Sequence, residues 1–175
     1  DRLWHNSGFT ITLATAQTVN SVAWPARDKN GATLGDGVYL GVEVSTATGA
    51  GVPTITVSYT NSAGVAGRTG TNTVATVASS AAGTFYPIGL QAGDTGVRSV
   101  QTLTLSATWT SGVIHLVAYR PIMPLGLVAA GLPSTVNAVT GNLARVYDNS
   151  VPFLIYRPQT TTTTQLTAYT KFTQG

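Results

Sequence analysis

The chain has 175 residues, of which 43% are hydrophobic, so it is long enough to bury the core of one domain. Only 9% of its residues are charged, where roughly 25% is usual, and the nine cations behind the net charge of +3 form no run, which argues against nucleic acid as a partner. Cysteine is absent and no apolar run approaches the roughly 18 residues that cross a bilayer, so the sequence predicts no disulfide, no thiolate metal site and no membrane partner.

Threonine, with 30 residues, and glycine, with 19, replace the missing charges, and they are strand and turn formers. Apolar residues alternate with polar ones over residues 9–13, 38–45 and 53–59, and weaker strand patterns cover 72–77 and 85–90. The turn signals between these segments are Asp28-Lys29-Asn30-Gly31, Gly35-Asp36-Gly37 and Asn61-Ser62-Ala63-Gly64. This order indicates short β-strands joined by tight turns.

The clearest pattern covers residues 101–119. Alternation over 101–109 predicts a half-buried strand, and the nearly continuous apolar run over 113–119 predicts a strand that is covered on both faces. Thr110-Ser111-Gly112 stands between them as a turn signal. We therefore predict a β-hairpin here.

The sequence changes character after Arg120. Residues 121–133 are apolar but contain three prolines, which exclude a regular helix across them. Ser134 can cap a short helix that runs toward Ala144, and residues 153–156 read as a strand. A run of five threonines at 160–164 precedes a last predicted strand over 166–172.

Short strands at roughly ten-residue spacing predict an all-β fold, an antiparallel β-sandwich or jelly roll with a C-terminal extension. We expect residues 1–8 to form an N-terminal arm and residues 9–120 to form the β-sandwich body. Residues 121–175 are expected to form a C-terminal arm plus closing strands, packed on the same domain or on a neighbouring subunit.

The triplet Asp94-Thr95-Gly96 matches the turn in which aspartic proteases present a catalytic carboxylate, two of which share one proton. The chain holds one copy, so only a two-fold homodimer would supply both carboxylates. Gln91-Ala92-Gly93 precedes the triplet where the proteases have an apolar strand. We interpret the triplet as a tight turn whose aspartate bonds backbone two residues on, with a homodimeric aspartic protease as a remote alternative.

Other chemistry has little basis in the sequence. His5 and His115 are the only histidines and have no ligand partners at matching spacing, and Glu43 is the only glutamate. The acidic residues are too dispersed for a calcium loop. We expect no catalytic residue, no metal and no cofactor.

Three tryptophans, Trp4, Trp24 and Trp109, leave a second interpretation open. Aromatic rings stack on sugars, so a carbohydrate-binding module of the head-fibre or adhesin type is the alternative function, against the simpler interpretation that the rings lie in the core.

Assembly remains as the main expectation. A surface of hydroxyls and methyls has few charges to hold neighbours apart, which suits a protein that packs against copies of itself. The proline-broken segment 121–133 is hard to bury as regular structure in a small sandwich, so it either docks on another subunit or covers its own core. The candidate assembly contacts are Arg2, Trp4, Met123, Leu125, Leu127, Val128, Phe153 and Arg157.

The stretch FYPIGLQAGDTGVRSVQTLTLSATWTSGVIHLVAYRPI (85–122), followed by VYDNSVPFLIYRP (146–158), resembles structural proteins of tailed bacteriophages. More narrowly, it is similar to the small β-rich proteins that cement or decorate the capsid. The resemblance covers about residues 37–157 and the threonine-rich tail. It lies in the general pattern of the sequence rather than in a catalytic motif, so no site residue is carried over.

The resemblance implies a sandwich or jelly roll without enzymatic activity, located on the outer capsid surface of the virion. The implied partners are the major capsid protein and copies of the chain itself, with a homotrimer as the expected oligomer. Neck, tail and head-fibre proteins share this texture, so the position within the virion stays open.

Overall fold

The computed structural model describes residues 1–6, 8–127, 129, 132–137, 141, 143–156, 167 and 169. Within these residues the strands are β1 (Arg2–His5), β2 (Gln17–Thr18), β3 (Tyr39–Thr46), β4 (Ile55–Asn61), β5 (Arg68–Asn72), β6 (Phe85–Gly89), β7 (Val97–Leu105) and β8 (Val113–Tyr119). Every strand pairing is antiparallel, so the all-β, antiparallel prediction is confirmed.

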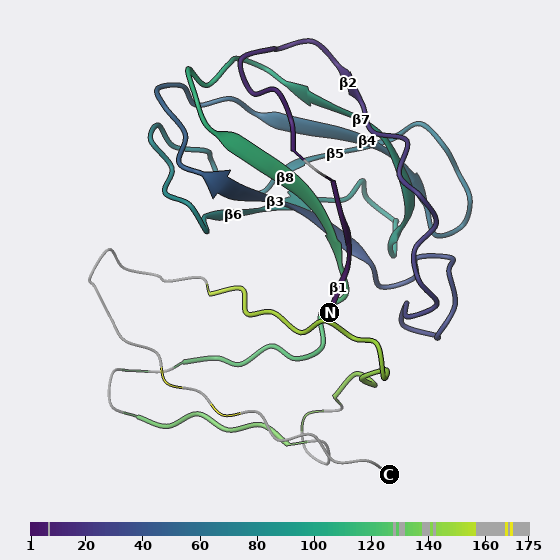
Figure 1. The fold of residues 1–175 in the computed structure, drawn as a ribbon. Coiled ribbons are helices and arrows are strands. Elements are labelled where there is room, and N and C mark those ends of the chain that lie inside the picture. The colour runs from purple at the N-terminus through teal and green to yellow at the C-terminus, as the bar shows by residue number, and fades with distance from the viewer. Residues whose placement is uncertain are drawn as a thin grey trace.

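The eight strands form one curled sheet with the order β1-β8-β3-β6-β5-β4-β7-β2 (Figure 1). The two halves of this sheet, β1-β8-β3-β6 and β5-β4-β7-β2, join where β5 meets β6 through two residue pairs only, Thr71–Gly89 and Asn72–Ile88. Glycines allow the close approach here, because a Cβ on Gly70 would lie 2.5 Å from the carbonyl oxygen of Gly89. The sheet therefore turns at this junction and encloses a core.

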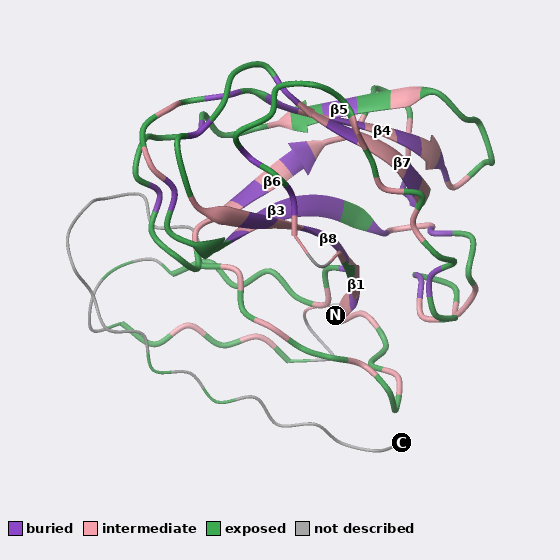
Figure 2. Ribbon diagram, turned by 45° about the horizontal axis from the view of Figure 1, so that its top comes forward, coloured by how far each residue is buried: buried purple, intermediate pink, exposed green. Residues whose placement is uncertain are grey.

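Alternate residues of the strands fill that core, which is the period expected of a pleated sheet with one wet face. The predicted buried positions of residues 38–45 and 53–59 are confirmed, and Figure 2 shows the burial of β3. Burying each such Val, Leu or Ile contributes about 1.5–3 kcal/mol. The fully buried apolar strand residues are Leu40, Val42, Val44, Ile55, Val57, Tyr59, Val97, Val100, Leu103, Leu105, Ile114, Leu116, Val117 and Ala118.

The predicted hairpin of residues 101–119 is wrong, although both of its strands exist. β7 pairs with β4 and β2, whereas β8 pairs with β3 and β1, in the other half of the sheet. Between them the chain passes over the core, where Trp109 is buried and its backbone N–H donates to the carbonyl of Ile11 at 3.0 Å. Alternation predicts which face of a strand is buried, but it does not indicate which strand lies beside it.

Two further predicted strands are also wrong. Residues 9–13 contribute only a single bridge, Phe9 to Ile114, and the chain then turns, leaving Leu13 48% exposed. Residues 73–77 are a loop, because the strand ends at Asn72 and Thr76 instead donates its hydroxyl to the carbonyl of Pro53 at 2.6 Å. The strand predictions at 38–45, 53–59 and 85–90 are confirmed as β3, β4 and β6.

The N-terminal segment covers both edges of the sheet, so the predicted arm at residues 1–8 is wrong. Residues 2–5 are β1, which pairs with β8 at one edge. The same segment reaches the other edge as β2, and beyond it the N–H groups of Val19 and Ser21 donate to β7 carbonyls at 2.8 and 2.9 Å. Because an open edge offers unpaired backbone groups to other chains, this segment protects the sheet.

The loop between β2 and β3 is fixed by a close backbone crossing. Gly35 has a φ of +83°, and a Cβ there would lie 1.9 Å from the carbonyl oxygen of Val97. That oxygen accepts the indole N–H of buried Trp24 at 2.6 Å. A side chain at position 35 would therefore strain the backbone and push the loop off β7.

Substituting Gly35 with alanine should destabilise the protein by about 3 kcal/mol or more, since the clash with backbone adds to the cost of a left-handed residue. The matched control is Gly83→Ala, where φ is +87° and nothing lies within 4 Å of the added Cβ. The control should cost only about 1–2 kcal/mol. Chemical denaturation of both variants makes the comparison, and equal losses would contradict the crossing as described.

Candidate functional site

Asp94 is the centre of a hydrogen-bonded cluster that shields its carboxylate from solvent. Its side chain is 2% exposed. The hydroxyl of Tyr59 donates to Oδ2 at 2.6 Å, Nδ2 of Asn61 donates to Oδ1 at 2.7 Å, and Nε of Arg68 donates to Oδ2 at 3.0 Å. The turn itself is present, with Gly93 at φ +87° and the N–H of Asp94 bonded to the carbonyl of Gln91 at 3.1 Å. The prediction that this carboxylate bonds to the backbone two residues on is wrong, because side chains of β4 and β5 donate hydrogen bonds to both of its oxygens.

The cluster holds this carboxylate ionised. The hydrogen bond from Arg68, with those from Tyr59 and Asn61, lowers the pKa of Asp94 to about 2. Burial and the neighbouring carboxylate raise the pKa of Tyr59 to about 12. A carboxylate in this state binds a proton weakly, whereas the protease chemistry needs a proton shared between two carboxyls. The geometry fits a structural ion pair.

The C-terminal segment leaves the sheet after Arg120 and lies outside it, on the side of the N-terminus (Figure 1). Within the predicted helix, Gly141 is helical and its N–H donates to the carbonyl of Asn137 at 2.8 Å, whereas residues 134–137 and 143–144 have no regular structure. The predicted strand at 153–156 is wrong, because the segment finds no strand edge to pair with. The predicted strand at 166–172 falls almost wholly outside the described residues.

Two parts of this segment differ in how they are held. We call residues 121–144 the linker and residues 145–153 the anchor segment. Among its described residues, the linker has hydrogen bonds between its own members: Ala144 to Ile122 and Leu132 to Ala129 at 3.3 Å, Gly141 to Asn137 at 2.8 Å, and Ser134 to Gly126 at 2.5 Å. The anchor segment, in contrast, binds the body of the protein through polar and aromatic contacts.

The polar contacts begin at Asp1, whose side chain is buried. The N–H of Val151 donates to Oδ1 of Asp1 at 2.8 Å, and the hydroxyl of Ser150 donates to Oδ2 at 3.0 Å. Beside them, the N–H of Arg2 donates to the carbonyl of Val151 at 2.9 Å. These bonds align residues 150–151 with the start of β1.

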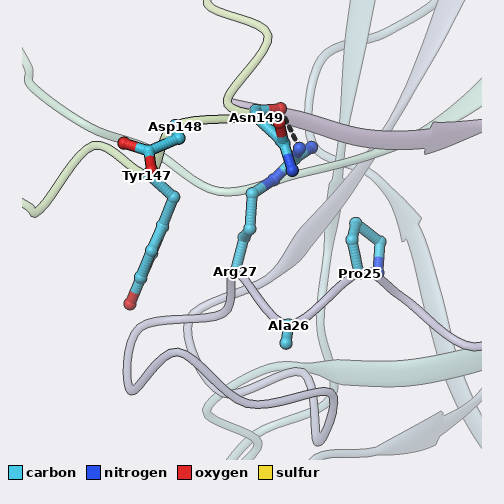
Figure 3. Close-up of a pocket in the computed structure, with 6 residues that line it drawn as sticks. All are labelled: Pro25, Ala26, Arg27, Tyr147, Asp148 and Asn149. Atoms are coloured by element: carbon cyan, nitrogen blue, oxygen red, sulfur yellow. Dashed lines mark hydrogen bonds between the residues drawn. The ribbon is translucent and has the colours of Figure 1, made fainter.

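Two arginines of the body add to this attachment. Arg27 donates to the carbonyl of Asn149 (Figure 3) and to that of Arg2, and its Nε lies 3.2 Å from the carboxylate of Asp1. Arg120 is 3% exposed and donates to the carbonyl of Arg145 at 2.5 Å. An open pocket of about 310 Å³ lies between the loop before β3 and the anchor segment. It is lined by Pro25, Ala26, Arg27, Tyr147, Asp148 and Asn149.

An aromatic cluster holds the end of the anchor segment. The ring centroid of Phe153 lies 6.2 Å from that of Phe85 and 6.0 Å from that of Tyr119, with the guanidinium of Arg2 5.7 Å from the ring. Phe85 itself lies over Gly41, where a Cβ would come within 2.1 Å of its ring. Aromatic pairs at these separations add about 0.5–1.5 kcal/mol beyond their buried area.

The structure places the candidate assembly contacts in different surroundings. Met123, Leu125 and Leu127 are 37%, 40% and 47% exposed on the linker. Arg2, which is paired with Glu43, and Phe153 belong to the attachment within the chain. Trp4 packs on Trp24 with ring centroids 5.6 Å apart. Val128 and Arg157 lie outside the described residues.

The sequence analysis missed the body residues that receive the anchor segment. Asp1, Arg27 and Arg120 are isolated charges in the sequence, and nothing in their spacing joins them. The aromatic cluster left a weak signal, since Phe85 and Tyr119 stand at the half-buried positions of alternating strands. Those positions normally face water, so aromatic rings there indicate that something covers them.

Trp24 and Trp109 lie in the core, and their indole N–H groups are bonded to the carbonyls of Val97 and Val77 at 2.6 and 3.4 Å. His5 and His115 stack with ring centroids 5.8 Å apart, and burial, with Arg2 and His115, lowers the pKa of His5. Within the described part of the chain, no group of three or more His, Asp or Glu side chains is placed to hold a metal ion.

No protein-family model, curated protein sequence or solved structure matches this chain. The described residues include no helix long and apolar enough to cross a membrane.

Replacing Asp94 with alanine should lower the free energy of unfolding at pH 7 by about 2 kcal/mol, because Tyr59, Asn61 and Arg68 lose their shared acceptor. The matched control is Asp36→Ala, whose carboxylate accepts one exposed bond from Asn30, and it should cost about 0.5 kcal/mol or less. Urea denaturation of the three proteins measures the difference.

The loss should depend on pH. The pKa of Asp94 is lowered in the folded state, to about 2, so its contribution is complete above the ordinary carboxyl pKa and disappears as the pH falls. The difference between the wild type and Asp94→Ala should therefore shrink between about pH 5 and pH 2. A difference that stays constant over this range would show that the ionised carboxylate is not what stabilises the cluster.

Proposed function

We propose that the protein is a non-enzymatic structural component of a virion, a capsid decoration or cement protein that binds the lattice of the major capsid protein. The observation that carries the proposal is the linker, which exposes Met123, Leu125 and Leu127 while the chain is held at Arg120 on one side and by the anchor segment on the other. The resemblance of residues 85–122 and 146–158 to phage structural proteins supports the same function.

The shape of the linker suits a docking element. Pro121, Pro124 and Pro133 restrict the backbone and leave fewer conformations to lose on binding. Both ends are fixed, so the apolar side chains are presented in a limited region of space. Exposed apolar residues in one segment are typical of protein–protein contact sites.

The composition favours assembly as well. With 9% charged residues, the surface has little repulsion to oppose close packing of copies. A protein that binds only the assembled lattice stabilises that state by its binding free energy. A homotrimer would bind at several points at once, which makes release slow even when each contact is modest.

The carbohydrate-binding alternative is less well supported. It depended on tryptophans as a stacking platform, but Trp24 and Trp109 are buried and Trp4 packs against Trp24. Of the aromatic rings outside the core, Phe85 and Tyr119 lie against Phe153 of the chain itself, whereas Tyr39, Tyr156 and Tyr169 are exposed.

A variant with Met123, Leu125 and Leu127 all replaced by serine should bind assembled capsids at least about 100-fold more weakly, with an unchanged melting temperature. The matched control replaces three exposed apolar residues of the body, Val22, Val52 and Val65, by serine and should bind like the wild type. Co-sedimentation with heads that lack the protein measures binding. Equal binding by both variants would remove the linker from the contact.

Electron microscopy of the particle tests the function itself. Density for the chain is expected on the outer surface at three-fold or quasi-three-fold positions of the lattice. If heads incubated with excess protein carry no such density, the decoration function is wrong.

A further inference from the structure

We propose that the anchor segment of one chain binds the body of a second copy, so that neighbouring molecules exchange their C-terminal segments. This deepens, and rests on, the proposed function, because it names the partner of the C-terminal segment as another copy of the chain. It also assigns a site for that partner, the surface beside β1 that residues 145–153 cover.

The receiving site is complete without the linker. The anchor segment contacts residues that the folded body positions, namely Asp1, Arg2, Arg27, Asp28, Phe85, Tyr119 and Arg120. Their geometry is set by β1, β6, β8 and the loop before β3. An anchor segment from another chain can therefore make the same hydrogen bonds and ring contacts, as in other exchanges of identical elements.

The length of the linker also permits the exchange. It has 24 residues, from Pro121 to Ala144, and an extended chain of that length spans about 80 Å. A body of 120 residues has a radius of gyration of about 14 Å. The linker is thus long enough to reach the equivalent site on a neighbour that is in contact with its own body.

The exchanged arrangement can also bury apolar surface that stays exposed without exchange. The anchor contacts are the same within a chain and between chains, so they do not decide between the two arrangements. Leu132, which is not one of the proposed docking residues, is 60% exposed when the linker folds back on its own body. When two linkers cross between neighbouring bodies, the Leu132 side chains of the two copies can pack on one another, which removes apolar surface from water. Exchange therefore gains apolar burial at no loss of anchor contacts.

The absence of cysteine from the chain permits a direct test. Ala26 and Asn149 line opposite sides of the same pocket, and no hydrogen bond of either side chain holds the anchor segment (Figure 3). One full-length chain carries Ala26→Cys, and a second, of different mass through a tag, carries Asn149→Cys. The two are co-expressed, so that segments can exchange during folding, and treated with a short bismaleimide.

With one thiol in each chain, the two cysteines come together in this pocket only when the anchor segment of one chain lies on the body of the other. The expected result is a covalent heterodimer at least about tenfold more abundant than with a control pair, because exchange holds the thiols at an effective concentration on the order of millimolar. The control pair combines Asn149→Cys with Ala66→Cys, an exposed residue in the turn between β4 and β5. Adding Phe153→Ala to the Asn149→Cys chain should reduce the heterodimer, since the anchor segment loses its ring contacts.

A chain with both Ala26→Cys and Asn149→Cys completes the experiment. If it cross-links only within itself, while the single-cysteine chains give no heterodimer above the control, the anchor segment binds only its own body and the exchange is wrong. Binding to capsids is measured separately on the same proteins. Heterodimers that fail to bind capsids would contradict the decoration function alone, whereas capsid binding by unexchanged chains would contradict the exchange alone.

Discussion

The structure depends on how the two edges of an open, curled sheet are covered. Without β1 and β2, the other six strands of the described sheet would leave an edge at β8 and another at β7, and the N-terminal segment covers both, as β1 and β2. The chain that follows β8 therefore finds no free edge beside it and leaves the sheet at Arg120. The C-terminal segment is attached by isolated hydrogen bonds and ring contacts and not by a ladder, which is why its apolar residues remain at the surface.

The few charged residues of the chain serve this arrangement. Asp28 is buried and its carboxylate accepts the backbone N–H groups of Asn30, Ala32 and Gly35, which shapes the loop that Gly35 packs against β7. Asp94 joins β4 and β5 to the turn before β7 through Arg68 and its other partners. Asp1 joins the N-terminal and C-terminal segments. These three carboxylates are therefore used inside the molecule, and few of the six acidic residues remain for the outer surface.

The alternation of apolar and polar residues predicted β3, β4 and β6, because a half-buried strand shows its two-residue period in neighbouring positions of the sequence. The pairing of β7 and β8 was predicted wrongly, since it depends on contacts with β4 and β3 from earlier in the chain. Asp94 illustrates the same limit, as its three partners lie 35, 33 and 26 residues away and share no motif with it. Met123, Leu125 and Leu127 could be singled out because apolar residues between prolines have few ways to be buried. The division between linker and anchor segment could not, because it depends on which body residues the chain meets.

Hydrogen–deuterium exchange, measured on the free protein and on protein bound to capsids, tests the central claim that the linker is presented for assembly while the anchor segment is fixed. In the free protein, the amides of residues 122, 123 and 125–127 should exchange rapidly, and that of Val151, bonded to Asp1, should exchange slowly. On binding, the linker amides should become protected, whereas Val151 should change little. Linker amides that exchange at the same rate in both states would contradict the account.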